Sequence, residues 1–231
     1  MERILRAEGD WQATLAKALR RVPRPIPVDP RLTPRDREAT GSPRYERSSM
    51  PPARRAATLM ALYPRLVEGA LQLVIPLTVR HAGLRSHAGE VSLPGGAVDE
   101  TDASPQAAAL REAWEEVGMA PDEVEILGSL DSVWIPVSNF ELRAFVGVLS
   151  TAPTLVAHEP EVEAIVELPA RVLVADDGLI EELIEGPGWR LRAGGYRHGE
   201  HLVWGATARS LAMFGSVLRL AAELSGESSA G

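Results

Sequence analysis

Three glutamates in one short segment are the clearest chemical signal in this sequence. Glu112, Glu115 and Glu116 stand at positions i, i+3 and i+4, so on a helix their carboxylates converge on one face. Carboxylates this close repel one another unless a cation neutralises them, and hard oxygen ligands favour Mg²⁺ or Mn²⁺. Because Mg²⁺ commonly binds together with substrate phosphates, the pattern predicts hydrolysis of a phosphate ester or phosphoanhydride. The alternative is a solvated helix face on which Arg111 and Glu115 form an ordinary ion pair.

The residues around the glutamates predict the element that carries them. Ser104 is a good N-cap, Pro105 suits the first turn of a helix, and Gly118 suits its C-terminal end. We therefore expect a helix over residues 105–117. The Pro-Gly-Gly run at residues 94–96 predicts a sharp turn just before it, so loop, cap and acidic helix form one unit.

This unit resembles the signature of the Nudix hydrolase family, G-x5-E-x7-R-E-U-x-E-E-x-G-U, in which U is a bulky apolar residue. Residues 111–119, REAWEEVGM, match its second half except that Ala113 stands at the first U position. The leading glutamate of the signature falls near Asp102, with eight residues rather than seven before Arg111, so the loop is one residue longer. The resemblance implies an α/β fold, the Nudix-type α/β/α sandwich with a mixed β-sheet.

A second motif, upstream, resembles the Nudix enzymes that cleave coenzyme A. Their pattern is L-L-T-x-R, a short spacer, then L-R-x-H-x-G-x-V-x-F-P-G-G, and residues 76–96 read PLTVRHAGLRSHAGEVSLPGG. Pro76 replaces a leucine and Leu93 replaces the phenylalanine. Residues 203–208, VWGATA, resemble the I-W-G-x-T-A element of the same enzymes. The resemblance implies cleavage of coenzyme A to 4′-phosphopantetheine and 3′,5′-ADP, with acyl-CoA thioesters as alternative substrates.

The upstream motif also supplies donors for an anionic ligand. The guanidinium groups of Arg80 and Arg85, with the imidazole of His87, are suited to phosphate oxygens. The alternative is that Arg85 and His87 hold the loop in place through backbone carbonyls. Arg111, which precedes Glu112 on the same helix, is expected to orient the glutamates rather than to touch substrate.

Glu161 is the best acidic candidate outside the helix. Its segment resembles the family's N-x-x-E-V element, which implies a metal ligand or a base that activates water. The alternative is the solvent face of a strand, because Glu159, Glu161 and Glu163 alternate along the chain.

The predicted mechanism is metal-assisted hydrolysis of a diphosphate. Glu112 and Glu116 hold Mg²⁺ or Mn²⁺ with help from Glu115, and either Glu115 or Glu161 takes the proton of the attacking water. Arg80 or Arg85 offsets the charge on the phosphate oxygens. Two rival functions share the helix: a Nudix hydrolase of NADH, ADP-ribose or another nucleoside diphosphate derivative, and a nucleotide sensor without turnover.

Composition limits the classes of protein to which this chain can belong. The chain has 231 residues, a net charge of −8 and no cysteine. The negative charge argues against nucleic-acid binding, and no apolar stretch approaches the ~20 residues of a membrane span. The absence of disulfides agrees with a cytoplasmic location.

Three regions are expected along the chain: a helix and a proline-rich arm at residues 1–50, a Nudix domain at 51–225, and a flexible tail at 226–231. The first helix, over residues 11–22, packs either on the core or on a second copy in a homodimer. Residues 71–80, 124–130, 141–149 and 162–168 are predicted strands, and 56–63 is either a strand or a helix. Further helices are predicted over residues 175–184 and 206–224.

Overall fold

The main sheet is built around one long hairpin. The structure is a computed structural model that describes residues 1–36, 47–81, 90–158, 160–186 and 189–227. β2 (Arg54–Val67) and β3 (Ala70–Arg80) pair antiparallel around a turn at Glu68 and Gly69, whose φ angles are 51° and 80°. Residues 56–63 are therefore strand and not helix. Eight residues of β2 in succession are buried, as in a strand that is covered on both faces.

The remaining strands of this sheet flank the hairpin. β9 (Val162–Pro169) and the short β4 (Val91–Ser92) pair with β3, while β8 (Phe140–Val148) and β5 (Gly95–Ala97) pair with β2. β6 (Glu125–Ser129) and β7 (Val133–Ile135) pair with β8. Because β2 and β8 run parallel and the other pairs run antiparallel, the sheet is mixed, as the sequence predicted.

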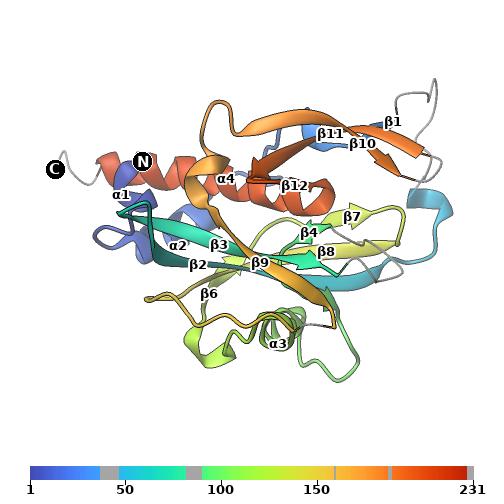
Figure 1. Ribbon diagram of the computed structural model, residues 1–231, viewed down its shortest axis with the longest axis horizontal. Helices are drawn as coiled ribbons and strands as arrows, with labels where there is room; N and C mark the ends of the chain where they lie inside the picture. Colours follow the sequence, from blue (N-terminus) through green and yellow to red (C-terminus); the bar gives the residue numbers. More distant parts are fainter. Residues whose placement is uncertain (37–46, 82–89, 159, 187–188, 228–231) are drawn as a thin grey trace.

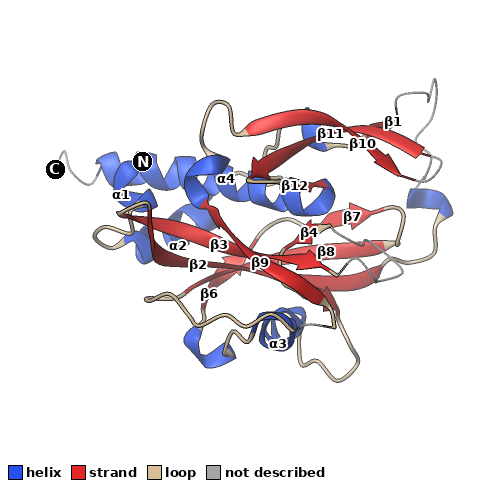
Figure 2. Cartoon of the chain, in the orientation of Figure 1, coloured by secondary structure: helices blue, strands red, loops and turns tan. Residues whose placement is uncertain are grey.

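Helices cover both faces of the main sheet (Figures 1 and 2). α3 (Pro105–Val117) lies on one face and packs its alanines and Val117 against the odd-numbered residues of β2. α4 (Gly205–Glu227) lies on the other face, beside α1 (Glu2–Leu5) and α2 (Trp11–Arg21). The predicted α/β class is confirmed. Within the described parts of the chain, no helix combines the length and apolar character that a membrane crossing requires.

A second sheet lies on the far side of α4, and it corrects one prediction. Residues 175–184 were expected to form a helix, but β10 (Leu179–Gly186) begins inside that range and pairs with β11 (Trp189–His198). β12 (His201–Trp204) and β1 (Arg35–Asp36) also pair with β11. Figure 1 shows this sheet stacked over α4, so a fourth layer extends the predicted sandwich.

The helix prediction failed because the local pattern is ambiguous. In Leu179–Gly186 apolar residues recur at helical spacing. The glutamates of β10, however, meet arginines of other strands: Glu185 pairs with Arg190 at 2.8 Å and Glu182 with Arg197 at 2.5 Å. Cross-strand pairing therefore decides the conformation, as tertiary contacts often do over local propensity.

The N-terminal segment belongs to the same core as α4. Trp11 and Leu15 of α2, and Ile26 and Leu32 beyond it, are buried with the apolar face of α4. Asp131 fixes the connection between them, because its carboxylate accepts from Arg24 Nη1 at 2.5 Å and from the backbone N–H of Ile26 at 2.6 Å. Short 3₁₀ turns complete the chain, at Pro30–Leu32, Arg47–Ser49, Pro121–Glu123 and Ala170–Leu173.

Candidate metal and diphosphate site

The acidic helix has the boundaries that the sequence predicted. Ser104 Oγ accepts from the N–H of Ala107 at 3.1 Å, and Gly118 ends the helix in the left-handed conformation, at φ 70°. The packing of the buried alanines and Val117 against β2 fixes the rotation of α3 relative to the sheet. As a result Glu116 points inward and is only 5% exposed, while Glu115 points outward with a side chain that is 55% exposed.

Two glycines bring the preceding loop against the glutamates. The N–H of Gly95 donates to Glu116 Oε2 at 3.1 Å. A Cβ atom on Gly96 would lie 2.6 Å from Glu112 Oε1, so a larger residue there would displace that carboxylate from its present position. The sharp turn predicted at residues 94–96 is only a bend at Pro94, because Gly95 and Gly96 belong to the strand β5, which pairs with β2 and forms one wall of the acidic site.

Burial makes the charges of this site costly. The pKa of Glu116 is raised to about 7: burial is the largest cause and nearby Glu112 and Glu161 add to it, while the Gly95 N–H and Arg80 act in the opposite direction. Burial also raises the pKa of Glu112, against the effect of Arg111. A positive charge close to the buried Glu116 and the partly buried Glu112 would therefore favour the ionised form of both carboxyl groups.

Arg111 connects the acidic residues, as expected from its position. Its Nη1 donates to Glu112 Oε1 and Glu115 Oε2, both at 2.9 Å. Its Nε and Nη2 donate to the two carboxylate oxygens of Asp102, each at 3.0 Å. Asp102 is 5% exposed, and the hydrogen bonds from Arg111 lower its pKa. Sequence reasoning left the role of Asp102 open, because the longer loop shifts it out of register with the family signature.

The structure brings Arg80 and Glu161 to the same site. Arg80 ends β3 and lowers the pKa of Glu116, and its Nε is buried with no hydrogen-bond partner among the described residues. The carbonyl of Glu161 accepts from the N–H of His81 at 3.0 Å, so the start of β9 lies next to the end of β3. Arg85 and His87, the other predicted substrate contacts, lie outside the described residues.

Comparison with known proteins agrees with this geometry. The NUDIX domain family model matches residues 68–177. An "Uncharacterized Nudix hydrolase NudL" of Salmonella paratyphi B is 41% identical over 160 residues, which are 68% of this chain and 79% of that protein. The chain belongs to the Nudix hydrolase family. The predicted enzyme class is thereby confirmed.

Two further comparisons bear on the extent of the Nudix match. A protein named "Uncharacterized Nudix hydrolase NudL" from Cronobacter sakazakii is 45% identical over 127 residues, and the match spans 55% of this chain and 62% of that relative. The crystal structure of a MutT/nudix family protein from Enterococcus faecalis has the same fold, with a TM-score of 0.50 at 16% identity over 79% of this chain and 65% of that one. The names of the two NudL relatives state no substrate.

The donor set of the Nudix site fits a hard divalent cation. Glu112 and Glu116 offer oxygen ligands from adjacent turns of α3, and a cation bound there would favour the ionised form of both carboxyl groups. Among the described residues, no three histidine, aspartate or glutamate side chains are arranged to hold a metal ion by themselves. Water and substrate phosphates would have to complete the coordination, as is usual for Mg²⁺.

Asp102→Asn tests the anchor of Arg111. The change keeps the shape of the side chain but removes the charge that holds Nε and Nη2, so we expect Mn²⁺ affinity to fall about 10–100-fold, as for other residues that orient a metal ligand. Titration calorimetry measures this directly. Asp99→Asn is the matched control, because Asp99 is 63% exposed and lies 3.8 Å from Arg111. Equal losses in the two variants would contradict the assigned role.

Proposed function

We propose that this Nudix hydrolase cleaves the diphosphate linkage of coenzyme A, or of an acyl-CoA, in a reaction that requires Mg²⁺ or Mn²⁺. The observation that supports it best is the meeting of three features at one site. The buried carboxylate of Glu116 lies beside that of Glu112, and the Gly95–Gly96 backbone contacts both. The buried Nε of Arg80, which lies nearby, can donate a hydrogen bond to a ligand.

In this proposal the glutamates of α3 hold the cation. Glu112 and Glu116 are the principal ligands, Glu115 assists them, and Arg111 keeps Glu112 and Glu115 in position. When bound, the cation would neutralise phosphate charge and lower the pKa of water. Glu116, 5% exposed, gains most from such a counter-charge, because its own burial disfavours ionisation.

The other residues act on substrate and water. Arg80 donates from its Nε, which has no partner within the described part of the chain, to a phosphate oxygen, and Arg85 and His87 are proposed to bind the same anion. Either Glu115 or Glu161 takes the proton from the attacking water. Both are exposed, so each can exchange that proton with solvent. A P–O bond of the diphosphate breaks as the oxygen of water forms the new one.

The substrate assignment rests on the motif at residues 76–96 and on the VWGATA segment, which resemble coenzyme A-cleaving Nudix enzymes. The products would be 4′-phosphopantetheine and 3′,5′-ADP. A cytoplasmic location, the division of the chain near residue 50 and the formation of a homodimer belong to the same set of proposals, whereas the N-terminal helix itself packs on α4.

Product analysis tests the function. We expect the purified protein with Mn²⁺ or Mg²⁺ to release 3′,5′-ADP from coenzyme A faster than it cleaves 3′-dephospho-CoA, NADH or ADP-ribose, and EDTA to abolish the reaction. Chromatography of the products measures all four. Turnover of the others without cleavage of coenzyme A would retain a diphosphate hydrolase and reject its substrate. No turnover of any of them would favour a nucleotide sensor.

A further inference from the structure

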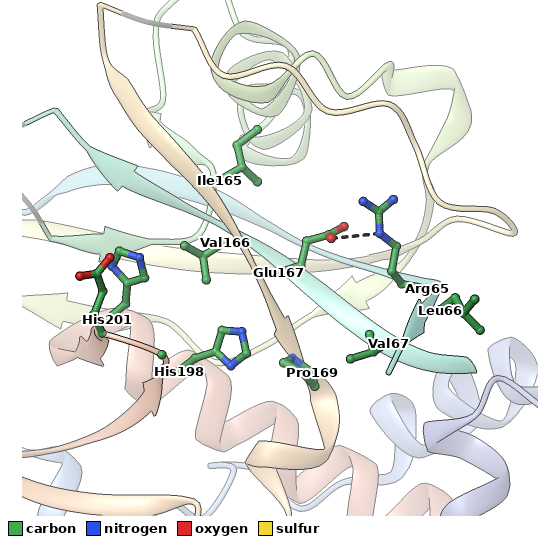
Figure 3. A pocket seen from close by; sticks show the side chains of 11 residues that line it. Arg65, Leu66, Val67, Ile165, Val166, Glu167, Pro169, His198 and His201 are labelled. Carbon is green, nitrogen blue, oxygen red and sulfur yellow. Dashed lines mark ion pairs between the residues drawn. The ribbon is translucent and has the colours of Figure 1, made fainter. Parts of the chain in front are cut away.

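A groove lies along β9, beyond the acidic site. Its volume is about 510 Å³, and three elements form it: the end of β2, the second half of β9 and the turn between β11 and β12. Figure 3 shows β9 running through the middle, with the Arg65–Glu167 pair on one side and His198 and His201 on the other. Nothing in the proposed chemistry at α3 uses these residues.

β9 connects the groove to the site. The strand begins at Val162, directly after Glu161, and reaches the groove at Ile165 and Glu167. Ile165 packs against the core cluster that includes the alanines of α3, so this face of β9 is the one that faces α3. At ~3.3 Å per residue, Val162 and Glu167 are about 16 Å apart along the strand. A ligand that reached from the start of β9 to Glu167 would therefore need an extended arm.

Glu167 is a fixed hydrogen-bond acceptor in the groove. The hydroxyl of Tyr63 donates to Glu167 Oε1 at 2.6 Å, and Arg65 Nε lies 3.0 Å from Oε2. Tyr63 is fully buried, and burial together with Glu167 raises the pKa of its hydroxyl, which therefore stays protonated. Arg65 balances the charge of Glu167, whose side chain is 25% exposed. The remaining lone pairs suit an N–H or O–H donor more than a free cation.

The rest of the groove combines polar and apolar groups, and Glu200 adds one further carboxylate to its lining. Burial, with His201 and Arg171 nearby, lowers the pKa of His198, so its imidazole is uncharged at neutral pH. Ile165 and Val166, which lie on opposite faces of β9, and the exposed Leu66 supply apolar surface to the groove. Apolar walls with a few well-placed polar groups are typical of sites for uncharged organic chains.

We propose that this groove binds the part of the substrate that leads away from the diphosphate, an uncharged arm that carries amide or hydroxyl groups. Glu167 accepts from one such group, and the apolar wall contacts the segments between them. The inference rests on the proposed function, since the arm of coenzyme A consists of three units joined by two amide bonds. The groove would make the enzyme prefer coenzyme A to diphosphates without such an arm.

Leu66→Trp is the test, because Leu66 is 71% exposed and a tryptophan there narrows the groove without disturbing the core. We expect the KM for coenzyme A to rise about tenfold with little change in kcat, the pattern of lost ground-state binding. The KM for ADP-ribose should not change. Leu71→Trp is the matched control: Leu71 is the cross-strand partner of Leu66, is 46% exposed, and lies outside the groove.

The outcomes separate the two proposals. Equal changes for both substrates in Leu66→Trp, or no change for either, would overturn the groove assignment and leave the hydrolase intact. Cleavage of ADP-ribose without cleavage of coenzyme A would also overturn it. If the wild-type protein cleaved no diphosphate, the proposed function would fail, and calorimetry with pantetheine would then test the groove alone. Binding that Leu66→Trp weakens would support the groove assignment. The absence of binding would overturn it.

Discussion

Replacing Glu116 by glutamine is expected to lower diphosphate hydrolysis more than about 100-fold at saturating substrate, beyond the range typical of residues that only orient a metal ligand. The amide cannot supply the negative charge that holds a hard cation. Its oxygen can still accept from the Gly95 N–H, so the loop should stay in place. Because burial already disfavours ionised Glu116, the metal-free variant should be at least as stable as the wild type.

Two measurements make this result specific. Initial rates at increasing Mn²⁺ report catalysis, and the rise in Tm on adding Mn²⁺ reports binding; both responses should be lost in Glu116→Gln. Glu125→Gln is the control, since it makes the same chemical change at an exposed position on β6. Turnover at the native rate in saturating metal would show that the α3 account is wrong.

Gly95→Ala is expected to lower the free energy of unfolding by more than about 3 kcal/mol, through backbone strain and a steric clash together. Gly95 has φ +152°, and a Cβ atom there would lie 2.3 Å from the carbonyl oxygen of Ala57. The clashing oxygen atom belongs to the backbone of β2, in the middle of the sheet, and cannot move aside. Denaturant unfolding measures the loss.

Gly69→Ala separates the two causes. Gly69 also has a positive φ, at +80°, but no atom lies within 4 Å of the Cβ position. This variant should lose only about 1–2 kcal/mol, the cost of placing an L-residue in that conformation. A loss in Gly95→Ala no larger than in Gly69→Ala would mean that β5 can move away from β2.

Local patterns predicted the elements that carry their own signals. Ser104 and Gly118 mark the ends of α3, and both caps are present. The strands around it follow from apolar runs between turn residues. The second sheet could not be predicted in this way. The glutamates of β10 form ion pairs with arginines of β11 and with Arg35, and the local sequence does not specify these partners.

The site could be predicted in part. The helical spacing of Glu112, Glu115 and Glu116 gave the acidic cluster, but not which member is buried, since that depends on the rotation of α3 against the sheet. The resemblance suggested Arg80 and Glu161, and only the fold places β3 and β9 side by side. The family signature pointed to the position of Asp102, but not to its two hydrogen bonds with Arg111. The groove at Glu167 depends on contacts between distant segments, so spacing in the sequence could not reveal it.

The pairing of β2 with β8 has a consequence for how the chain folds. β2 forms its hairpin with β3 locally, but its parallel partner starts at Phe140, opposite Arg54. α2, near the N-terminus, packs on α4 at the other end of the chain. Contacts of such high sequence separation slow folding, because loop-closure entropy is lost before they form. During synthesis on the ribosome, β2 and α2 therefore expose apolar surface until their partners emerge, and the domain closes only when α4 has been made.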